Sequence, residues 1–259
     1  MSFAVYDLRY CPESFDFLTF FCAAKSIDKD CEIVFVDGQR GLNKKFKNQE
    51  RLERFQNILV DTCDVFGSKH RVVKSWDAGC VFPPDYPKST AIRTYFMNVL
   101  FDLYRENGRI YKFSLPQEKK NHVTITIRNS PRNEYRNSNL EQWKIVRDQI
   151  SRTHEVIWID DYSVKKISIL DRVKLYESAV MNLFVGNGPA SFGILSEVPY
   201  MVFKMITHGA ASGAHFDLIG LPEGSQYPWR NNNQKLVWED DNADVVLRHF
   251  KDWADFVPC

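Results

Sequence analysis

The chain has 259 residues, enough for one large domain or for two domains of about 120–130 residues each. Hydrophobic residues make up 44% of the chain and charged residues 26%, which excludes an intrinsically disordered protein. The 34 lysines and arginines balance 33 aspartates and glutamates, so a net charge of +1 provides no general attraction for nucleic acid. Any anion that the protein binds must be recognised locally.

The cysteine pattern indicates a reducing environment, and the hydropathy indicates a chain without a membrane-spanning segment. The six cysteines form no Cys-x-x-Cys pair and accompany no cluster of histidines, so neither a disulfide framework nor a zinc site is expected. The N-terminal residues lack a signal-peptide pattern, and no apolar run approaches the roughly 20 residues that span a bilayer. We expect a cytoplasmic protein without a transmembrane segment, and peripheral association with a membrane is left open.

The first half of the chain has the pattern of a parallel α/β domain. Short apolar runs at 3–6 and 32–36 flank a helical segment at 17–24, which together predict a βαβ unit. A strand is expected at 71–73, and the proline-rich segment 76–88 predicts a loop.

Two further helices are expected in this half. The first of them is predicted to place four apolar residues on one buried face: Leu52, Phe55, Ile58 and Leu59. The second runs over about 89–106 and is expected to end at Gly108 through a left-handed C-cap. The polar segment 116–121 then predicts a domain boundary, so that residues 1–115 and 121–259 form two domains.

The second half repeats the alternation of strands and helices. Strands are expected at 123–127 and 155–159, with an irregular basic loop from Arg128 to Asn137 after the first. The tetrapeptide Ser138-Asn139-Leu140-Glu141 matches a capping box and predicts the start of a helix. A terminal amphipathic helix at 244–256 is an element able to pack back on the first domain. The predicted fold is two Rossmann-like, doubly wound domains that face a cleft.

The stretch 181–205 predicts a strand, a glycine turn, a short helix and another strand. Its turn, Gly186-Asn187-Gly188-Pro189, precedes a helix start at which the amides of Ala190, Ser191 and Phe192 are expected to be unpaired. Such a helix start can hold a phosphate or a pyrophosphate. An ordinary turn between a strand and a helix is the competing interpretation.

Ligands of open parallel sheets collect at the carboxyl ends of the strands, so the loops after residues 127, 159 and 185 are expected to share one edge. Arginines beside a helix start suit a nucleotide diphosphate, because guanidinium groups neutralise the charge of the phosphates. Arg132 is interpreted as a solvated loop charge. The candidate donor-binding residues are Arg128, Arg136, Asp160, Asn187, Gly188, Pro189, Ala190 and Ser191.

Several common sites are missing from the sequence. There is no P-loop motif, no Gly-x-Gly-x-x-Gly after the first strand, and no Gly-x-Ser-x-Gly elbow. These absences speak against a P-loop NTPase, a standard NAD enzyme and an α/β-hydrolase.

The two Rossmann-like halves and the sequence Val-Gly-Asn-Gly-Pro-Ala-Ser-Phe, followed by Val-Pro, resemble GT-B glycosyltransferases. The similarity is to heptosyltransferase-like enzymes of bacterial surface-glycan assembly, and it covers roughly residues 121 to 205. In that family, a Gly-Pro turn before a short helix and a proline before the next strand line the nucleotide-sugar site. The matching residues in this chain are Gly188, Pro189, Ala190, Ser191 and Pro199. The chain departs from the family in lacking the usual Asp and His around the Gly-Pro turn, and it has Asn187 and Ser191 nearby instead.

The resemblance implies a metal-independent glycosyltransferase without a cofactor, which moves a sugar from a nucleotide-diphosphate donor to a glycan or lipid-linked acceptor. It also implies that the first half presents the acceptor and a carboxylate base. Asp7 and Glu13 are the candidate bases, and Asp37 is a weaker one. A capping or ion-pairing role for Asp7 is an equal alternative. A nucleotide-sugar epimerase and a non-catalytic sugar-nucleotide-binding subunit are the alternative functions.

Overall fold

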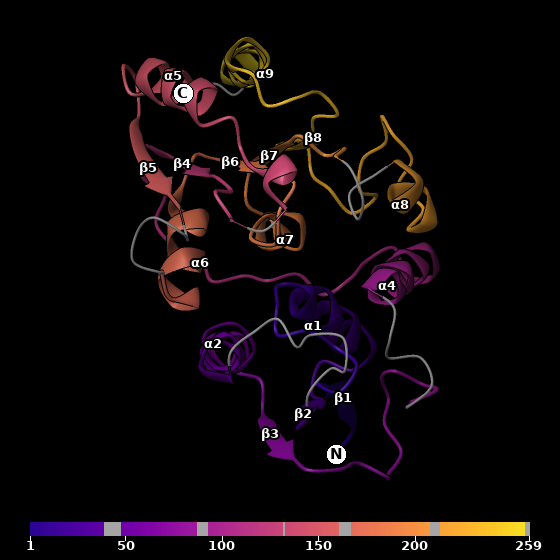
Figure 1. Cartoon of the computed structure of the whole chain (residues 1–259). Helices are drawn as coiled ribbons and strands as arrows, with labels where there is room; N and C mark the ends of the chain where they lie inside the picture. Colours follow the sequence, from indigo (N-terminus) through magenta and orange to yellow (C-terminus); the bar gives the residue numbers. More distant parts are fainter. Residues whose placement is uncertain (39–47, 87–92, 132, 161–166, 208–212, 257–259) are drawn as a thin grey trace. The chain divides into compact units, whose positions relative to one another are not determined.

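A computed structural model describes residues 1–38, 48–86, 93–131, 133–160, 167–207 and 213–256 (Figure 1). The chain divides into two compact units, of which unit 1 holds Met1–Ser114 with Ser168–Asp171 and unit 2 holds Leu115–Ile167 with Arg172–Cys259. Each unit contains a parallel sheet, as the predicted α/β class requires.

Unit 1 is built on three parallel strands in the order β1-β2-β3. The strands are β1 (Phe3–Asp7), β2 (Glu32–Val36) and β3 (His70–Val73). Ala4 also forms a parallel bridge with Phe82, and the Val5 amide donates to the Phe82 carbonyl at 2.8 Å. The segment at Phe82 therefore borders β1 on the side opposite to β2.

The two faces of this sheet are covered differently. Tyr6 packs its ring on Phe17 and Phe20 of α1 (Asp16–Ile27), with centroids 5.0 and 4.9 Å away. Helix α4 (Arg93–Asn107) packs on α1, and Gly108 follows it with φ of 67°, which confirms the predicted left-handed C-cap. The opposite face holds three buried valines, and the loop 74–86 contributes side chains to it.

The helix predicted to contain Leu52 and Leu59 includes a wider turn. It consists of α2 (Asn48–Arg54), a π-helical segment η1 (Phe55–Val60) and α3 (Asp61–Val65). Ile58 and Leu59 are buried, whereas Leu52 is 66% exposed. The prediction that Leu52 shares their buried face is wrong, because a π-helical turn changes the phase of the residues that follow it.

Unit 2 is built on five parallel strands in the order β5-β4-β6-β7-β8. Their bounds are β4 (His122–Thr126), β5 (Glu155–Ile159), β6 (Met181–Val185), β7 (Tyr200–Phe203) and β8 (Gln234–Leu236). Within the unit this is the order 2-1-3-4-5, a doubly wound topology whose direction reverses between β4 and β6. With α7 (Ala190–Ile194), the strand, turn, helix and strand expected over 181–205 are confirmed.

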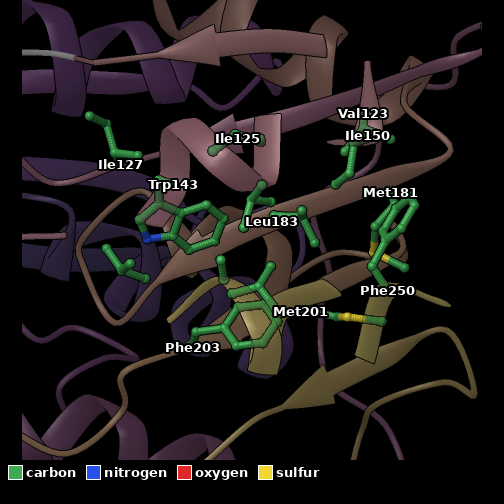
Figure 2. Close-up of a cluster of buried hydrophobic side chains, with 14 of the residues drawn as sticks. Val123, Ile125, Ile127, Trp143, Ile150, Met181, Leu183, Met201, Phe203 and Phe250 are labelled. Atoms are coloured by element: carbon green, nitrogen blue, oxygen red, sulfur yellow. The ribbon is translucent and has the colours of Figure 1, made fainter. Parts of the chain in front are cut away.

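Helices cover both faces of the unit 2 sheet. Helices α5 (Leu140–Ile150) and α9 (Ala243–Phe256) pack on the face that Val123, Leu183 and Phe203 present (Figure 2). Helix α6 (Ile169–Ser178) contacts the other face, where the ring of Tyr176 lies 5.1 Å from that of Phe184. A further short helix, α8 (Gly213–Leu218), precedes β8. Trp143 of α5 is fully buried in this core.

Candidate functional site

The strand order of unit 2 defines where a ligand is expected. In a doubly wound sheet, the connections after the two strands at the reversal leave in opposite directions and open a crevice at their carboxyl ends. In unit 2 these strands are β4 and β6. The basic loop follows β4 and the glycine turn follows β6, so both predicted segments lie at the reversal point.

The basic loop is held at two places by hydrogen bonds to its own backbone. Near its ends, the Arg128 amide donates to Ser138 Oγ and the Ser138 amide donates to the Arg128 carbonyl, each at 2.8 Å. Further in, the Asn137 side chain exchanges two hydrogen bonds of 2.9 Å with the backbone of Ser130. These contacts hold the described parts of the loop and so limit the positions open to the side chains of Arg128 and Arg136.

Side chains join this loop to its neighbours. Arg136 Nη2 donates to the Gly186 carbonyl at 3.2 Å, and Asn129 Nδ2 lies 3.5 Å from Asp160 Oδ2. The loops after β4, β5 and β6 therefore meet at one edge, as the sequence predicts. A Cβ on Gly186 would lie 3.0 Å from the Lys204 carbonyl oxygen, so a side chain at this turn position would crowd the backbone of Lys204.

The start of α7 differs from the expectation. The Ala190 amide donates to Asn187 Oδ1 at 3.2 Å, the Ser191 amide to the Gly188 carbonyl at 3.0 Å, and the Phe192 amide to the Pro189 carbonyl at 3.1 Å. The prediction that these three amides are unpaired is wrong, because the turn and the Asn187 side chain satisfy them locally. An anion at this edge therefore cannot depend on these three amides.

The capping residue of α5 also differs from the prediction. Asn139 is the N-cap, and its side chain accepts from the Gln142 amide, because Ser138 Oγ is engaged by Arg128. Asp241 supports this helix start with a buried carboxylate that accepts from the Asn139 amide at 2.8 Å and from Trp143 Nε1 at 2.9 Å. Lys204 completes the cluster at 3.1 Å from Asp241.

A buried arginine lies close to the end of β4 and is not among the residues that the sequence predicts for the site. Arg172 of α6 is 2% exposed, and its Nη1 donates to Tyr176 Oη at 3.0 Å. The same hydroxyl lies 3.0 Å from Thr126 Oγ1, in the last residue of β4. The four-residue spacing of Arg172 and Tyr176 is a signal for their contact, whereas their proximity to Thr126 depends on the fold.

The candidate base Asp7 is fully buried at the end of β1. Its Oδ1 accepts from the Arg9 amide and from Arg9 Nε, both at 2.9 Å, and its Oδ2 accepts from Arg9 Nη2 at 2.7 Å and from Tyr86 Oη at 2.9 Å. Asp7 raises the pKa of Arg9, and burial with the Asp7 hydrogen bond raises the pKa of Tyr86 to about 12. This geometry corresponds to the ion-pairing alternative for Asp7.

The other two candidate bases, Glu13 and Asp37, also lie in unit 1. Glu13 is 6% exposed and pairs with Arg51, whose Nε donates to it at 3.0 Å and whose Nη2 also donates to the Gly38 carbonyl at 2.8 Å. Asp37 is exposed, and its amide donates to the Val73 carbonyl.

Two aromatic residues of the segment before β8 have a structural role. Tyr227 and Trp229 are buried and stack on each other with centroids 5.0 Å apart, so they anchor their loop. Arg132, interpreted from the sequence as a solvated loop charge, lies outside the described residues.

Within the described ranges, no group of three or more His, Cys, Asp or Glu residues is arranged to hold a metal ion. None of the helices in these ranges has the length and apolar character needed to cross a membrane. No protein-family model matches the chain, and comparisons with curated proteins and with solved structures likewise found no match.

Proposed function

We propose that unit 2 binds the diphosphate of a nucleotide-sugar and that the protein is a metal-independent glycosyltransferase of the GT-B type. In this proposal Arg128 and Arg136 contact the phosphates. The donor lies against the turn that is formed by Asn187, Gly188, Pro189, Ala190 and Ser191. Asp160 orders the neighbouring loop through Asn129. The acceptor is a glycan or a lipid-linked sugar.

One observation carries the proposal. The sheet reverses direction between β4 and β6, and the arginine loop and the glycine turn follow these two strands. The hydrogen bond from Arg136 to the Gly186 carbonyl joins the two segments at that point. Guanidinium groups are well suited to such a ligand because their paired donors match the oxygens of a phosphate.

A second candidate function is a non-catalytic subunit that binds a sugar nucleotide. The burial and ion pairing of both Asp7 and Glu13 favour it, because a general base must reach the hydroxyl from which it takes a proton. The nucleotide-sugar epimerase remains an alternative that the same diphosphate site would serve.

A nucleotide panel tests the proposal. We expect nucleoside diphosphates to raise the unfolding midpoint of the whole chain, whereas the corresponding nucleosides have little effect, because a ligand bound only by the folded state adds apparent stability. If no diphosphate raises the midpoint beyond a salt control, the proposed site is rejected.

Product analysis then separates the three functions. Release of free nucleoside diphosphate that depends on an added glycan acceptor indicates transfer. Interconversion of the donor sugar without release indicates epimerisation. Binding without either reaction, for every donor that binds, indicates the subunit.

A further inference from the structure

Unit 1 has its own reversal point, at which a cation and an aromatic ring are exposed. Strands β2 and β3 lie on one side of β1, and the segment at Phe82 pairs with β1 on the other side. The spatial order β3, β2, β1, Phe82 places a reversal between β1 and this segment. In parallel sheets such a point is where ligands bind at the carboxyl ends of the strands.

The residues that follow the two segments meet at this point. Asp7 ends β1, Arg9 comes two residues later, and Tyr86 comes four residues after Phe82. Arg9 Nη2 lies 3.1 Å from Tyr86 Oη, and both groups donate to Asp7. The carboxylate is fully buried, whereas the Arg9 side chain is 41% exposed. The group presented to solvent at the reversal is therefore a guanidinium.

Arg9 is held in a single orientation. Its Nε and Nη2 donate to Asp7, and within the described residues its Nη1 makes no hydrogen bond. Its stem lies on Gly38, where an added Cβ would come within 2.2 Å of Arg9 Cγ. The guanidinium lies 5.6 Å from the ring of Tyr10, which is 40% exposed. A fixed guanidinium edge beside an exposed aromatic ring matches the needs of an anionic ligand that also has a face to stack.

We infer that the edge formed by Arg9, Tyr10 and Tyr86 is a binding site for an oxyanion, the phosphate or carboxylate group of a small ligand. In this site Arg9 Nη1 donates to the anion, and the buried carboxylate of Asp7 orients the guanidinium of Arg9. The ring of Tyr10 contacts the remaining part of the ligand. This site belongs to unit 1 alone and does not depend on diphosphate binding by unit 2.

Titration of the whole chain with inorganic phosphate tests the inference, with sodium chloride at matched ionic strength as the control. Phosphate should raise the unfolding midpoint of the unsubstituted protein beyond the effect of chloride. Arg9→Gln should weaken the phosphate dissociation constant about tenfold or more, as loss of a charge-assisted contact does. The same titration with acetate shows whether a carboxylate is accepted as well. An equal phosphate response in Arg9→Gln, or no response beyond chloride in the unsubstituted protein, overturns the inference.

Further variants keep the test decisive if Arg9→Gln folds poorly. Gly38→Ala displaces Arg9 without a change of charge and should also weaken phosphate binding, whereas Gly79→Ala, with no atom within 4 Å of its added Cβ, should not. The double variant Asp7→Asn/Arg9→Gln leaves no buried carboxylate unpaired and should lose the response. The comparison is repeated on an Arg128→Ala background, in which phosphate binding at the proposed diphosphate site is weakened, and there Arg9→Gln should still remove the remaining response. If Arg128→Ala alone abolishes the whole response, phosphate binds unit 2, which overturns this inference and supports the diphosphate site.

Discussion

The two units hold the residues at the carboxyl ends of their strands in different ways. In unit 1 the contacts run between charged side chains, as Asp7 pairs with Arg9 and Glu13 with Arg51. In unit 2 the contacts that shape the basic loop run largely to the backbone, at Arg128, Ser130 and Gly186. A geometry built on ion pairs is sensitive to the loss of one charge, whereas a geometry built on backbone contacts keeps its shape.

This difference has a functional meaning. Where the loop is shaped by backbone contacts, a charged side chain can be replaced with a loss of binding and little loss of stability. Where a buried carboxylate orients an arginine, replacement of the carboxylate affects stability and binding together. The following substitutions test this comparison.

The largest effect is expected in the core beneath the unit 2 edge. Trp143→Ala should lower the free energy of unfolding by about 3–5 kcal/mol, because it leaves a cavity and removes the indole donor of Asp241. Urea denaturation followed by circular dichroism measures this loss. Ile145→Ala on the same helix is the control, since Ile145 is 46% exposed and should change stability by at most about 0.5 kcal/mol. Similar values for both variants would show that α5 does not support this edge.

The ion pair of unit 1 should give the next largest effect. Asp7→Asn should lower the free energy of unfolding by about 1.5–3 kcal/mol, because the buried group loses charge-assisted hydrogen bonds. Asp37→Asn, at an exposed carboxylate, should have little effect. If Asp7→Asn instead retained full stability and donor affinity but lost turnover, Asp7 would be assigned as the catalytic base.

The arginine loop of unit 2 should respond in binding rather than in stability. Arg128→Ala should weaken binding of a nucleoside diphosphate about tenfold, equivalent to about 1.4 kcal/mol, and leave nucleoside binding unchanged. The Arg128 backbone, which closes the loop with Ser138, is retained in this variant. Calorimetric titration with both ligands measures the ratio. Equal weakening of both would reject a phosphate contact.

The smallest effect is expected at Tyr86, and it depends on pH. The pKa of Tyr86 rises from 10.0 to about 12 in the folded protein, so the folded state holds this proton more tightly than the unfolded state. Its contribution is fully present below pH 10 and is lost as the pH rises through about 12. Tyr86→Phe should cost about 1 kcal/mol at neutral pH. The variant should also lose less stability than the unsubstituted protein between these pH values, and parallel pH profiles in urea denaturation would contradict the assigned contact.

Local patterns were sufficient for much of the architecture. The apolar runs gave the strands β2 and β5 with their bounds, and the stretch 181–205 was correctly divided into strand, turn, helix and strand. These features depend on side-chain periodicity and on glycine and proline, which act over a few residues. Two of the errors arose where a local group had two possible partners. Ser138 bonds to Arg128 instead of capping α5, and the amides after Gly188 bond within their own turn.

The sequence by itself determined the α/β class, the order of most elements and the two segments that carry arginine and glycine in unit 2. Only the tertiary structure decided which strands are neighbours, and therefore where each sheet reverses direction. It also decided that Tyr86 bonds to Asp7, 79 residues away, and that Arg136 reaches the Gly186 carbonyl, 50 residues away. The physical reason is that strand order and long-range hydrogen bonds depend on how whole layers pack, and no local periodicity encodes that choice.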